Sequence, residues 1–328
     1  MYYKMEKIKN YGISKLNPAF LERMKEILES EYDDFCSYCE KPLLNSIRCN
    51  TLKISVSELK TRLEKKWKIA QPYKEHPEIM IIVSELAPGE IGKAIEHTLG
   101  YYYVQDISSM MPSIALSPEK SDIVLDLCAS PGSKTSQIAA IMENSGAIIA
   151  NDLNLGRISI LSTNLQRCGV TNAIITRSEG ANLCAKIIKK HLKFDKILVD
   201  APCSGEGTIR ASKKPMVFSE NIIRNLSGLQ KLLLVSAIKT LKVGGEIVYS
   251  TCTYAPEENE RVISYVLDNY PVEIMKIEIP VKTKQGMTEW KGEKFNENVK
   301  KCSRIYPQDN NTEGFFLAKL KKVGECEE

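Results

Sequence analysis

The chain has 328 residues, of which 43% are hydrophobic and 26% charged, and its formal net charge is +4. This composition is ordinary for a soluble globular protein, the length suits two domains, and the mild positive charge permits an anionic partner without demanding one. No apolar run approaches the roughly 20 residues of a membrane span, and the first residues lack the apolar core of a secretory signal, so we expect a cytoplasmic protein that binds no membrane.

The first predicted element is a helix over residues 17–32. Asn17 is a suitable cap, Pro18 fits the first helical position, and the apolar residues fall on one face, as in a packing helix. Just beyond it, Cys36 and Cys39 form a lone C-x-x-C, while the three histidines of the chain are scattered. A zinc site is therefore only a minor alternative, and we expect reduced thiols and no metal.

A small α+β module is predicted next, in a β-α-β-β order. Its segments are a strand over 46–54, a helix over 57–66 capped by Ser57, and strands over 67–69 and 79–83. The order resembles a truncated RNA-recognition-type fold without the aromatic consensus of such folds. The module is rich in basic residues, which form either a solvated helix face or an RNA-binding face. They are Arg48, Lys53, Lys60, Arg62, Lys65, Lys66 and Lys68.

We place a domain boundary near residue 100, which separates an N-terminal domain (1–100) from a second domain (101–328). A strand over 101–104 leads into a helix headed by Asp106 and Ser108. From residue 123, strands and helices alternate, which predicts an α/β fold with a doubly wound parallel sheet. The predicted strands cover 123–127, 147–151, 173–176, 194–199 and 246–250, with helices over 134–142, 155–168, 180–191 and 227–241. Late strands at 272–277 and 314–320 are expected to add an antiparallel pair at one edge.

A possible cofactor site follows the first strand of this sheet, in DLCASPGSKTSQIA. Pro131 and Gly132 indicate a tight turn that lets the backbone approach a ligand, and the helix from Lys134 points its dipole there. The turn lacks the G-x-G-x-x-G pattern, so it is weak evidence for a pyrophosphate. Asp152, after the second strand, is placed to accept ribose hydroxyls, and Glu179, after the third, to reach an adenine amine. An adenosine cofactor without a pyrophosphate points to S-adenosylmethionine.

Two further segments, DAPCSGEGTIR at 200–210 and STCTY at 250–254, each follow an apolar run of the kind that forms a buried parallel strand. Each places a cysteine, Cys203 or Cys252, at the carboxyl end of a strand, which is the edge where open α/β sheets bind ligands. We therefore expect the two thiols and the carboxylate of Asp200 to converge on one crevice.

Methylation of cytosine at carbon 5 needs groups of this kind, because that carbon is too poor a nucleophile to take a methyl group directly. A thiolate adds at carbon 6 while an acid shares a proton with nitrogen 3, a base later removes the carbon 5 proton, and the thiolate leaves. The base must leave any stack to enter such a pocket. Nearby basic residues either hold RNA phosphates or are solvated charges. They are Arg210, Lys213 and Lys214, with Lys134 and Arg157 as further candidates near the crevice.

The segments DLCASPGSKT, NDLN, DAPCSGEGTIR and STCTYAPEENE, in this order, resemble those of the RNA (cytosine-5)-methyltransferase family, which includes the NOL1/NOP2/Sun and RsmB-type enzymes. The resemblance runs from RCNTLK, which contains Arg48, through YVQDISSM to TEGFFLAKL, and so covers most of the chain. It implies a Rossmann-like S-adenosylmethionine-dependent methyltransferase sheet with a small N-terminal α+β RNA-recognition-like domain. It also implies an RNA substrate and S-adenosylmethionine as the cofactor.

The resemblance further implies the role of each site residue. Cys252 of the TC motif is implied to be the nucleophile, and Cys203 of the PC motif to assist breakdown of the adduct. Asp200 is implied to contact nitrogen 3 of the base and to lie near the methyl donor. Glu179 stands where the family usually has Asp. The expected cofactor residues are Cys128, Ala129, Ser130, Pro131, Gly132, Ser133, Lys134, Asp152, Arg157, Glu179 and Asp200.

Several functions compete at this point. A tRNA cytosine-5 methyltransferase is favoured, because a compact form that ends soon after Leu320 looks like the tRNA-modifying members, and an rRNA enzyme of the same family is the alternative. A catalytically silent RNA-binding or assembly factor is disfavoured by the presence of both cysteines, Asp200 and the cofactor turn. An amino-group methyltransferase would need a polar-Pro-Pro-aromatic motif where this chain has DAPC. We expect a monomer.

Overall fold

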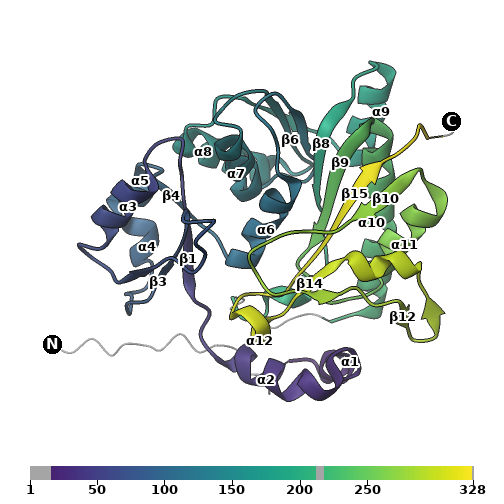
Figure 1. The fold of residues 1–328 in the computed structure, drawn as a ribbon, viewed down its shortest axis with the longest axis horizontal. Helices are drawn as coiled ribbons and strands as arrows, with labels where there is room; N and C mark the ends of the chain where they lie inside the picture. The colour runs from purple at the N-terminus through teal and green to yellow at the C-terminus, as the bar shows by residue number, and fades with distance from the viewer. Residues whose placement is uncertain (1–15, 212–217, 327–328) are drawn as a thin grey trace.

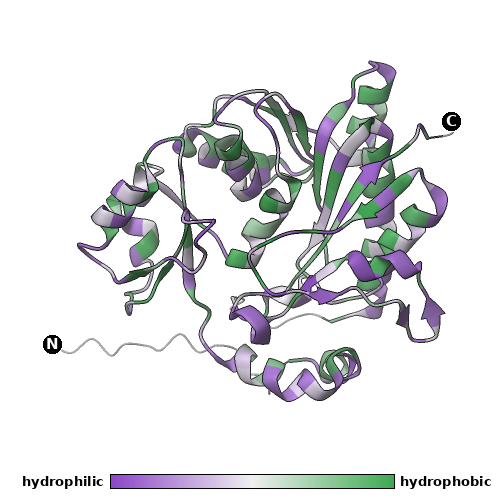
Figure 2. Cartoon of the chain, in the orientation of Figure 1, coloured by the Kyte–Doolittle hydropathy of each residue, from purple (hydrophilic) through white to green (hydrophobic). Residues whose placement is uncertain are grey.

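The computed structural model describes residues 16–211 and 218–326. A small four-stranded module lies on one side, a nine-stranded sheet with helices on both faces forms the larger part, and two N-terminal helices lie beneath that sheet (Figure 1). Hydrophobic residues run along the central strands of the large sheet and alternate with hydrophilic ones on the helices around it (Figure 2). None of the helices within the described ranges is long and apolar enough to cross a membrane.

The predicted N-terminal helix is α1 (Pro18–Leu28), which is followed by a 3-10 turn over Glu29–Glu31 and by a second helix, α2 (Tyr32–Glu40), that was not predicted. The Asn17 cap is confirmed, because its side chain accepts a hydrogen bond from the amide of Ala19. A continuous helix over 17–32 was wrong, because Glu29 has a positive φ of 49° that ends the regular hydrogen-bond ladder. The apolar faces of α1 and α2 pack on Ile209, Tyr254 and Tyr306 of the larger part.

The small module is an antiparallel sheet in the order β2-β3-β1-β4. Helix α3 (Val56–Leu63) is capped by Ser55, whose hydroxyl accepts from the amide of Glu58, and not by Ser57 as predicted. The strands are β1 (Asn45–Cys49), β2 (Ile69–Ala70), β3 (Ile79–Ile82) and β4 (Tyr102–Val104). Two short helices, α4 (Glu90–Lys93) and α5 (Ile95–Thr98), lie between β3 and β4 in the chain. Strand β4 pairs with β1, and the division of the chain near residue 100 stays a prediction.

The large sheet has the predicted doubly wound core. Five parallel strands lie in the order β9-β8-β5-β6-β7, so the order reverses between β5 and β8, and ligands bind at such a reversal. Helices α9, α10 and α11 cover one face, and α6 and α7 cover the other, with α8 packed beside α7. The strands are β5 (Ile123–Asp126), β6 (Ala147–Asp152), β7 (Ala173–Arg177), β8 (Phe194–Asp200) and β9 (Leu241–Thr251). The helices are α6 (Ile107–Leu116), α7 (Ser133–Ile141), α8 (Leu155–Cys168), α9 (Gly180–Lys189), α10 (Glu220–Thr240) and α11 (Glu260–Asn269).

The predicted antiparallel strands at the edge are confirmed as β15 (Phe315–Lys322), which pairs with β9, and β10 (Val272–Met275), which pairs with β15. Two short strands that the sequence did not predict extend the same edge, β14 (Ser303–Ile305) and β11 (Lys284–Gln285). The remaining elements are the hairpin β12 (Glu289–Trp290) and β13 (Glu293–Lys294), the 3-10 turns η3 (Glu206–Thr208) and η4 (Glu297–Lys301), and α12 (Pro307–Asn310).

Candidate active site

A cavity of about 540 Å³ opens where β5, β6 and β8 end, beside α10. Eight of the predicted site residues line it, namely Cys128, Ser130, Asp152, Arg157, Glu179, Asp200, Cys203 and Cys252. The other predicted cofactor residues, Ala129, Pro131, Gly132, Ser133 and Lys134, are not among the residues that line its wall and form the turn and the start of α7.

The two predicted cysteines meet at this cavity. The Sγ atoms of Cys203 and Cys252 lie 3.2 Å apart, and both are free thiols. The hydrogen bond with Cys252, together with burial, raises the pKa of the Cys203 thiol. Burial and the contact with Cys252 therefore favour the protonated form of the Cys203 thiol.

Asp200 is held on both carboxylate oxygens. Its Oδ2 forms an ion pair with Nζ of Lys134 at 2.7 Å, and its Oδ1 accepts a hydrogen bond from Oγ of Ser250 at 2.8 Å. Lys134 also donates to Oγ of Ser109 at 3.1 Å, which fixes the ammonium from the other side. The pair places a carboxylate in the cavity wall and leaves its cation in the protein interior, where the Lys134 side chain is 9% exposed.

The remaining wall presents polar groups at the ends of β6 and β7. Oδ1 of Asp152 accepts from the amide of Asn154 at 3.1 Å, and its Oδ2 lies 3.3 Å from Nη2 of Arg157. The same Nη2 donates to the Ser130 carbonyl at 2.7 Å, so Arg157 ties the turn to β6. Glu179 accepts from the side-chain amide of Asn182 at 2.5 Å.

The turn itself is built by a close approach at Gly132. Its φ of 98° lies in the left-handed region, and a Cβ there would meet Cδ1 of Leu161 at 3.0 Å. Behind the turn, burial raises the pKa of Asp126 to about 7, with Oδ2 accepting from Thr135 at 2.7 Å. Oδ1 of Asp126 is buried and has no hydrogen-bond partner among the described residues. Asp126 was not predicted as a site residue, although its place at the end of the first strand was the available signal.

The cavity suits S-adenosylmethionine. Its volume is in the range of small-molecule sites, and its wall combines the Asp152 carboxylate with apolar side chains such as Leu153 and Leu233. Carboxylates also suit a ligand that carries a sulfonium cation. When bound, this cofactor supplies an electrophilic methyl group.

The two cysteine loops are joined by buried polar residues that the sequence analysis missed. Oε2 of Glu206 accepts from Oγ1 of Thr253 at 3.0 Å and from the amide of Tyr254 at 3.2 Å. The hydroxyls of Ser204 and Thr253 lie 2.7 Å apart. Oε2 of Glu258 accepts from the amide of Ser204 at 3.0 Å. Glutamates inside the glycine-rich GEG and the PEEN stretches were the available signal.

Arg210 corrects one prediction. Its side chain is buried, and its guanidinium donates to the Thr312 carbonyl at 2.8 Å, to Oδ1 of Asn311 at 2.7 Å and to the carbonyls of Lys41 and Pro42. Through these bonds the guanidinium joins the end of α2 to the segment before β15. It is therefore not available to hold RNA phosphates, contrary to the prediction. Lys213 and Lys214 lie outside the described residues.

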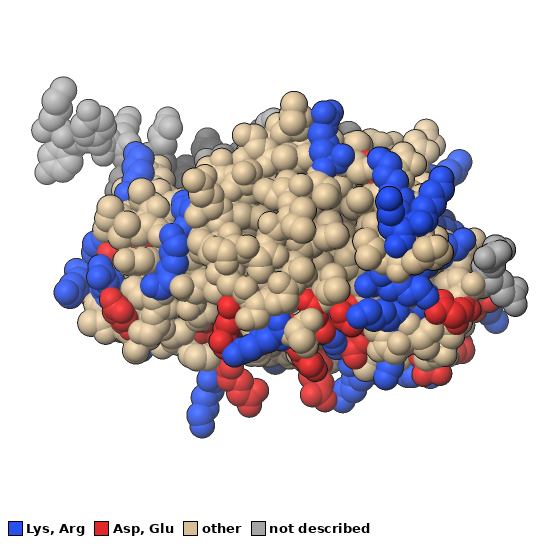
Figure 3. Space-filling view, turned by 90° about the horizontal axis from the view of Figure 1, so that it is seen from above, with Lys and Arg blue, Asp and Glu red and all other residues tan. Residues whose placement is uncertain are grey.

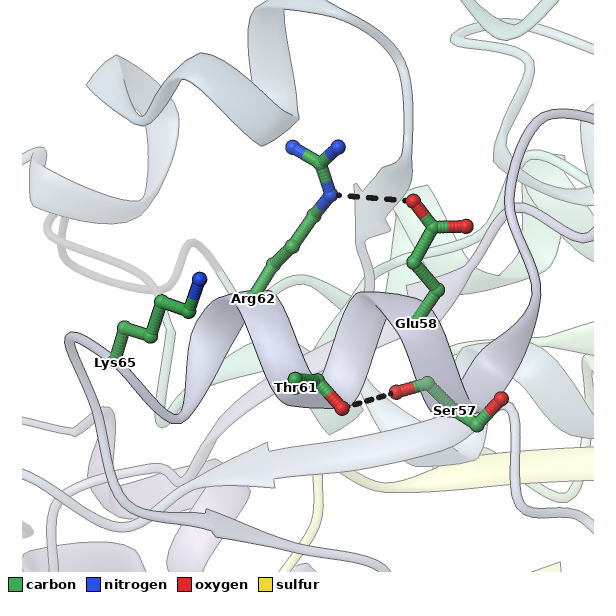
Figure 4. A pocket seen from close by; sticks show the side chains of 5 residues that line it. All are labelled: Ser57, Glu58, Thr61, Arg62 and Lys65. Carbon is green, nitrogen blue, oxygen red and sulfur yellow. Dashed lines mark hydrogen bonds and ion pairs between the residues drawn. The ribbon is translucent and has the colours of Figure 1, made fainter.

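The basic residues of the small module are largely engaged. Arg62 bonds to Glu58 along an exposed stretch of α3, around a shallow hollow that Lys65 also borders (Figure 4). Lys66 forms an ion pair with Glu96 at 2.7 Å, and Lys53 donates to backbone carbonyls. On the molecular face in Figure 3, basic and acidic side chains are interspersed along one rim beside a broad uncharged area.

Two family models match the chain. The model for the 16S rRNA methyltransferase RsmB/F matches residues 113–321, and the model for the N-terminal domain of 16S rRNA methyltransferase RsmF matches residues 16–107. A Pyrococcus abyssi protein named tRNA (cytosine(49)-C(5))-methyltransferase is 41% identical over 310 residues, which are 94% of this chain and 97% of that protein. Ribosomal RNA small subunit methyltransferase F of Psychromonas ingrahamii is 37% identical over 322 residues, which are 95% of this chain but 64% of that protein.

Solved structures of other proteins share the fold of this chain. A methyltransferase homolog protein from Pyrococcus horikoshii superposes with a TM-score of 0.82 at 35% identity, over 97% of this chain and all (100%) of that one. NSun6 from Pyrococcus horikoshii with SFG shares the fold, with a TM-score of 0.82 at 24% identity over 95% of this chain and 100% of that one. These matches confirm the predicted family, the α/β methyltransferase fold and the cofactor. The chain therefore belongs to the RsmB/F family of RNA (cytosine-5)-methyltransferases and is an S-adenosylmethionine-dependent enzyme.

Proposed function

We propose that this protein methylates carbon 5 of a cytosine in tRNA through a covalent bond between Cys252 and the base. The observation that carries the proposal is the contact between the Cys203 and Cys252 thiols at the cofactor cavity, beside Asp200. The tRNA substrate is supported by the Pyrococcus abyssi relative, which matches this chain over nearly the full length of both proteins. The positions of the thiols support the chemistry without depending on which RNA is bound.

The covalent step begins at Cys252. Its thiolate forms the Sγ–C6 bond, and the π electrons of the C5–C6 bond move onto the ring, so that carbon 5 becomes nucleophilic. Carbon 5 would then take the methyl group that S-adenosylmethionine supplies, with S-adenosylhomocysteine as the leaving group. Afterwards a base takes the carbon 5 proton, the electrons of that C–H bond restore the C5–C6 double bond, and the Sγ–C6 bond breaks. Cys252 is then a thiolate again, next to the protonated thiol of Cys203.

We assign Cys203 to the last of these steps. A thiol that keeps its proton can donate a hydrogen bond to the departing Cys252 thiolate and make it a better leaving group. We assign Asp200 to nitrogen 3 of the base: as the ring takes up electrons N3 gains a proton from water, and the Asp200 carboxylate at the cavity wall can accept a hydrogen bond from the resulting N3–H. For the cofactor, we assign Asp152 to the ribose hydroxyls and Glu179 to the adenine amine, with Arg157 supporting the turn.

Methyl transfer and adduct formation test this function together. The purified protein is incubated with radiolabelled S-adenosylmethionine and unmodified tRNA or rRNA, 5-methylcytosine is mapped by bisulfite sequencing, and covalent adducts are resolved on denaturing gels. We expect Cys203→Ala to accumulate a protein–RNA adduct and Cys252→Ala to give neither adduct nor product. Cys326→Ala, a partly buried thiol on the C-terminal segment, is the matched control and is expected to retain activity.

The outcomes separate the alternatives. If Cys252→Ala traps the adduct and Cys203→Ala abolishes it, the assignment of the nucleophile is wrong. If label enters rRNA only, the protein is an rRNA cytosine-5 methyltransferase. This second candidate is supported by the 16S rRNA names of the matching family models and by the 37% identical relative. If neither RNA is methylated but one binds tightly, the protein is a silent RNA-binding factor.

A further inference from the structure

Arg48 is a buried cation whose hydrogen-bond acceptors are all uncharged. It lies on β1, is 2% exposed, and donates from Nε to Oε1 of Gln105 at 3.1 Å and from Nη2 to the Ser133 carbonyl at 3.2 Å and Oγ of Ser136 at 2.9 Å. Burying a charge without a contacting counter-charge carries a desolvation cost that hydrogen bonds to neutral acceptors offset only in part. Packing alone therefore gives no reason for an arginine here.

The helix dipole gives no reason either. Ser133 and Ser136 lie in the first turn of α7, and a positive charge at a helix N-terminus is unfavourable. That turn directly follows the cofactor turn at Gly132, so the guanidinium reaches from the small module to the part of the large domain that shapes the cavity.

A second contact comes from the neighbouring strand. Tyr103, which is paired with Arg48 across β1 and β4, donates from its hydroxyl to the Pro131 carbonyl at 3.4 Å. Asn164 donates to the same carbonyl at 2.9 Å and to the Tyr103 hydroxyl at 3.1 Å. Adjacent side chains of the small module thus contact the cofactor turn at Pro131 and at Ser133, on both sides of Gly132.

The rest of the RCNTLK segment also reaches the large domain. Asn50 donates to the Cys168 carbonyl at 2.8 Å, and Lys53 donates to the Arg167 carbonyl at 2.7 Å. Both carbonyls lie at the end of α8, where a cation such as Lys53 is favoured by the helix dipole. The cations of this segment therefore serve a contact between the small module and the large domain.

We propose that Arg48 is a positioning residue of the cofactor site: the small module fixes the first turn of α7 through Arg48, and with it the turn at Gly132 and the Lys134–Asp200 pair. Lys134 follows Ser133 directly, and its ammonium pairs with Asp200 at 2.7 Å, so a shift of this helical turn moves the cation away from that carboxylate. Arg48 is not among the residues that line the cavity, so it would affect the cofactor only through the turn that it holds. The inference rests on the cofactor site and not on the identity of the RNA.

Equilibrium binding of S-adenosylhomocysteine, measured by calorimetry on the full chain without RNA, tests the role directly. We expect Arg48→Met to weaken this binding by about tenfold, because hydrogen bonds from a charged group to the turn are lost. RNA affinity, measured by filter binding, is expected to change less than about twofold. Arg48→Lys keeps the charge without the planar fork, and we expect it to recover only part of the affinity.

Two further variants keep the test decisive. Ser136→Ala removes one hydrogen-bond acceptor of Arg48 and leaves Arg48 in place, so it replaces Arg48→Met if that variant fails to fold. We expect Ser136→Ala to lose two- to threefold in S-adenosylhomocysteine affinity, which is about 0.5 kcal/mol at RT of roughly 0.6 kcal/mol. Arg62→Met removes an exposed arginine of the same module, on α3 (Figure 4), and is expected to bind S-adenosylhomocysteine like the wild type.

The inference is overturned if folded Arg48→Met binds S-adenosylhomocysteine like the wild type, or if Ser136→Ala does so when Arg48→Met does not fold. A selective loss of RNA affinity in Arg48→Met would instead assign Arg48 to the RNA surface. If the wild type methylates no RNA while Arg48→Met still loses S-adenosylhomocysteine affinity, the proposed function fails and the positioning role stands.

Discussion

The sulfur atoms of Cys203 and Cys252 lie 3.2 Å apart although the two residues are 49 positions apart in the sequence. The loops after β8 and β9 create this contact. The amide of Gly207 donates to the Cys252 carbonyl at 2.8 Å, and the hydroxyls of Ser204 and Thr253 lie 2.7 Å apart. The thiol pair is therefore a property of two joined loops, and perturbing the join changes the pair without touching either cysteine.

This proximity predicts that a mild thiol oxidant links the two cysteines. With diamide, both thiols lose their protons and two electrons in forming one S–S bond, and diamide is reduced to the hydrazine. The sulfurs need to approach by about 1.2 Å to reach a disulfide length near 2.05 Å. We expect the oxidised protein to lose methyl transfer and to recover it with dithiothreitol. Peptide mapping checks the link, and Cys203→Ser is expected to show none; a link between other cysteines in the wild type would contradict the prediction.

Gly207→Ala is expected to separate the loops. A Cβ at this position would lie 2.3 Å from the Gly314 carbonyl oxygen and 3.0 Å from that of Cys252, both of them backbone atoms that cannot rotate away. We expect a loss of about 1–3 kcal/mol of unfolding free energy and at least a tenfold fall in methyl transfer, as for overpacking of a tight site. Chemical denaturation and single-turnover methylation measure the two effects.

Gly228→Ala is the matched control for that substitution. Gly228 is exposed within α10, and a Cβ there would meet no atom within 4 Å. We expect it to raise the unfolding free energy by about 0.5–1 kcal/mol, because alanine has the higher helix propensity, and to leave methyl transfer unchanged. Equal losses in both variants would show that the loop contact at Gly207 is not the cause.

The large sheet and the thiol pair were predictable because each signal is local. A buried apolar run predicts a parallel strand, and Asp200, Cys203 and Cys252 follow such runs within a few residues, so their common edge follows from topology. Strands β11 and β14 have two and three residues, which is too short for a hydrophobic period to be detected. Their pairing depends on β15, far along the chain.

Arg210 and the buried glutamates were not predictable for a different reason. The partners of Arg210 come from the segments around Lys41 and Thr312, so nothing beside it in the sequence indicates burial. Charged residues are almost never fully buried unless paired, which makes a surface role the natural expectation for Arg210, Glu206 and Glu258. Only the folded arrangement shows that these groups join loops.

Glu206 predicts a pH dependence of stability. Burial raises its pKa from 4.5 in the unfolded chain to about 7. The folded protein holds a proton that the unfolded chain releases between these values, so this contribution to stability is complete below about pH 4.5 and is lost as the pH rises through 7. We expect Glu206→Gln, whose side-chain oxygen can still accept from Tyr254, to flatten this loss and to be more stable than the wild type at pH 8 by on the order of 2 kcal/mol.

Urea unfolding at pH 5 to 8 measures that difference. Asp126→Asn is expected to act in the same direction, because burial also raises the pKa of Asp126 to about 7. Glu58→Gln, at an exposed position of α3, is the control and should keep the wild-type slope. A Glu206→Gln protein that loses stability with pH as steeply as the wild type would show that Glu206 is ionised in the folded state.

Arg304 and Glu260 form a buried pair that anchors the segment after Cys252. Nε and Nη2 of Arg304 each donate to one carboxylate oxygen of Glu260 at 2.6 Å, and the two side chains are 3% and 0% exposed. We expect Arg304→Met or Glu260→Gln alone to cost about 3–5 kcal/mol of unfolding free energy, because each leaves a buried polar group or charge without its partner. The double variant is expected to cost clearly less than the sum, and below its melting temperature to retain S-adenosylhomocysteine binding. Additivity within about 0.5 kcal/mol in urea unfolding would contradict the coupling.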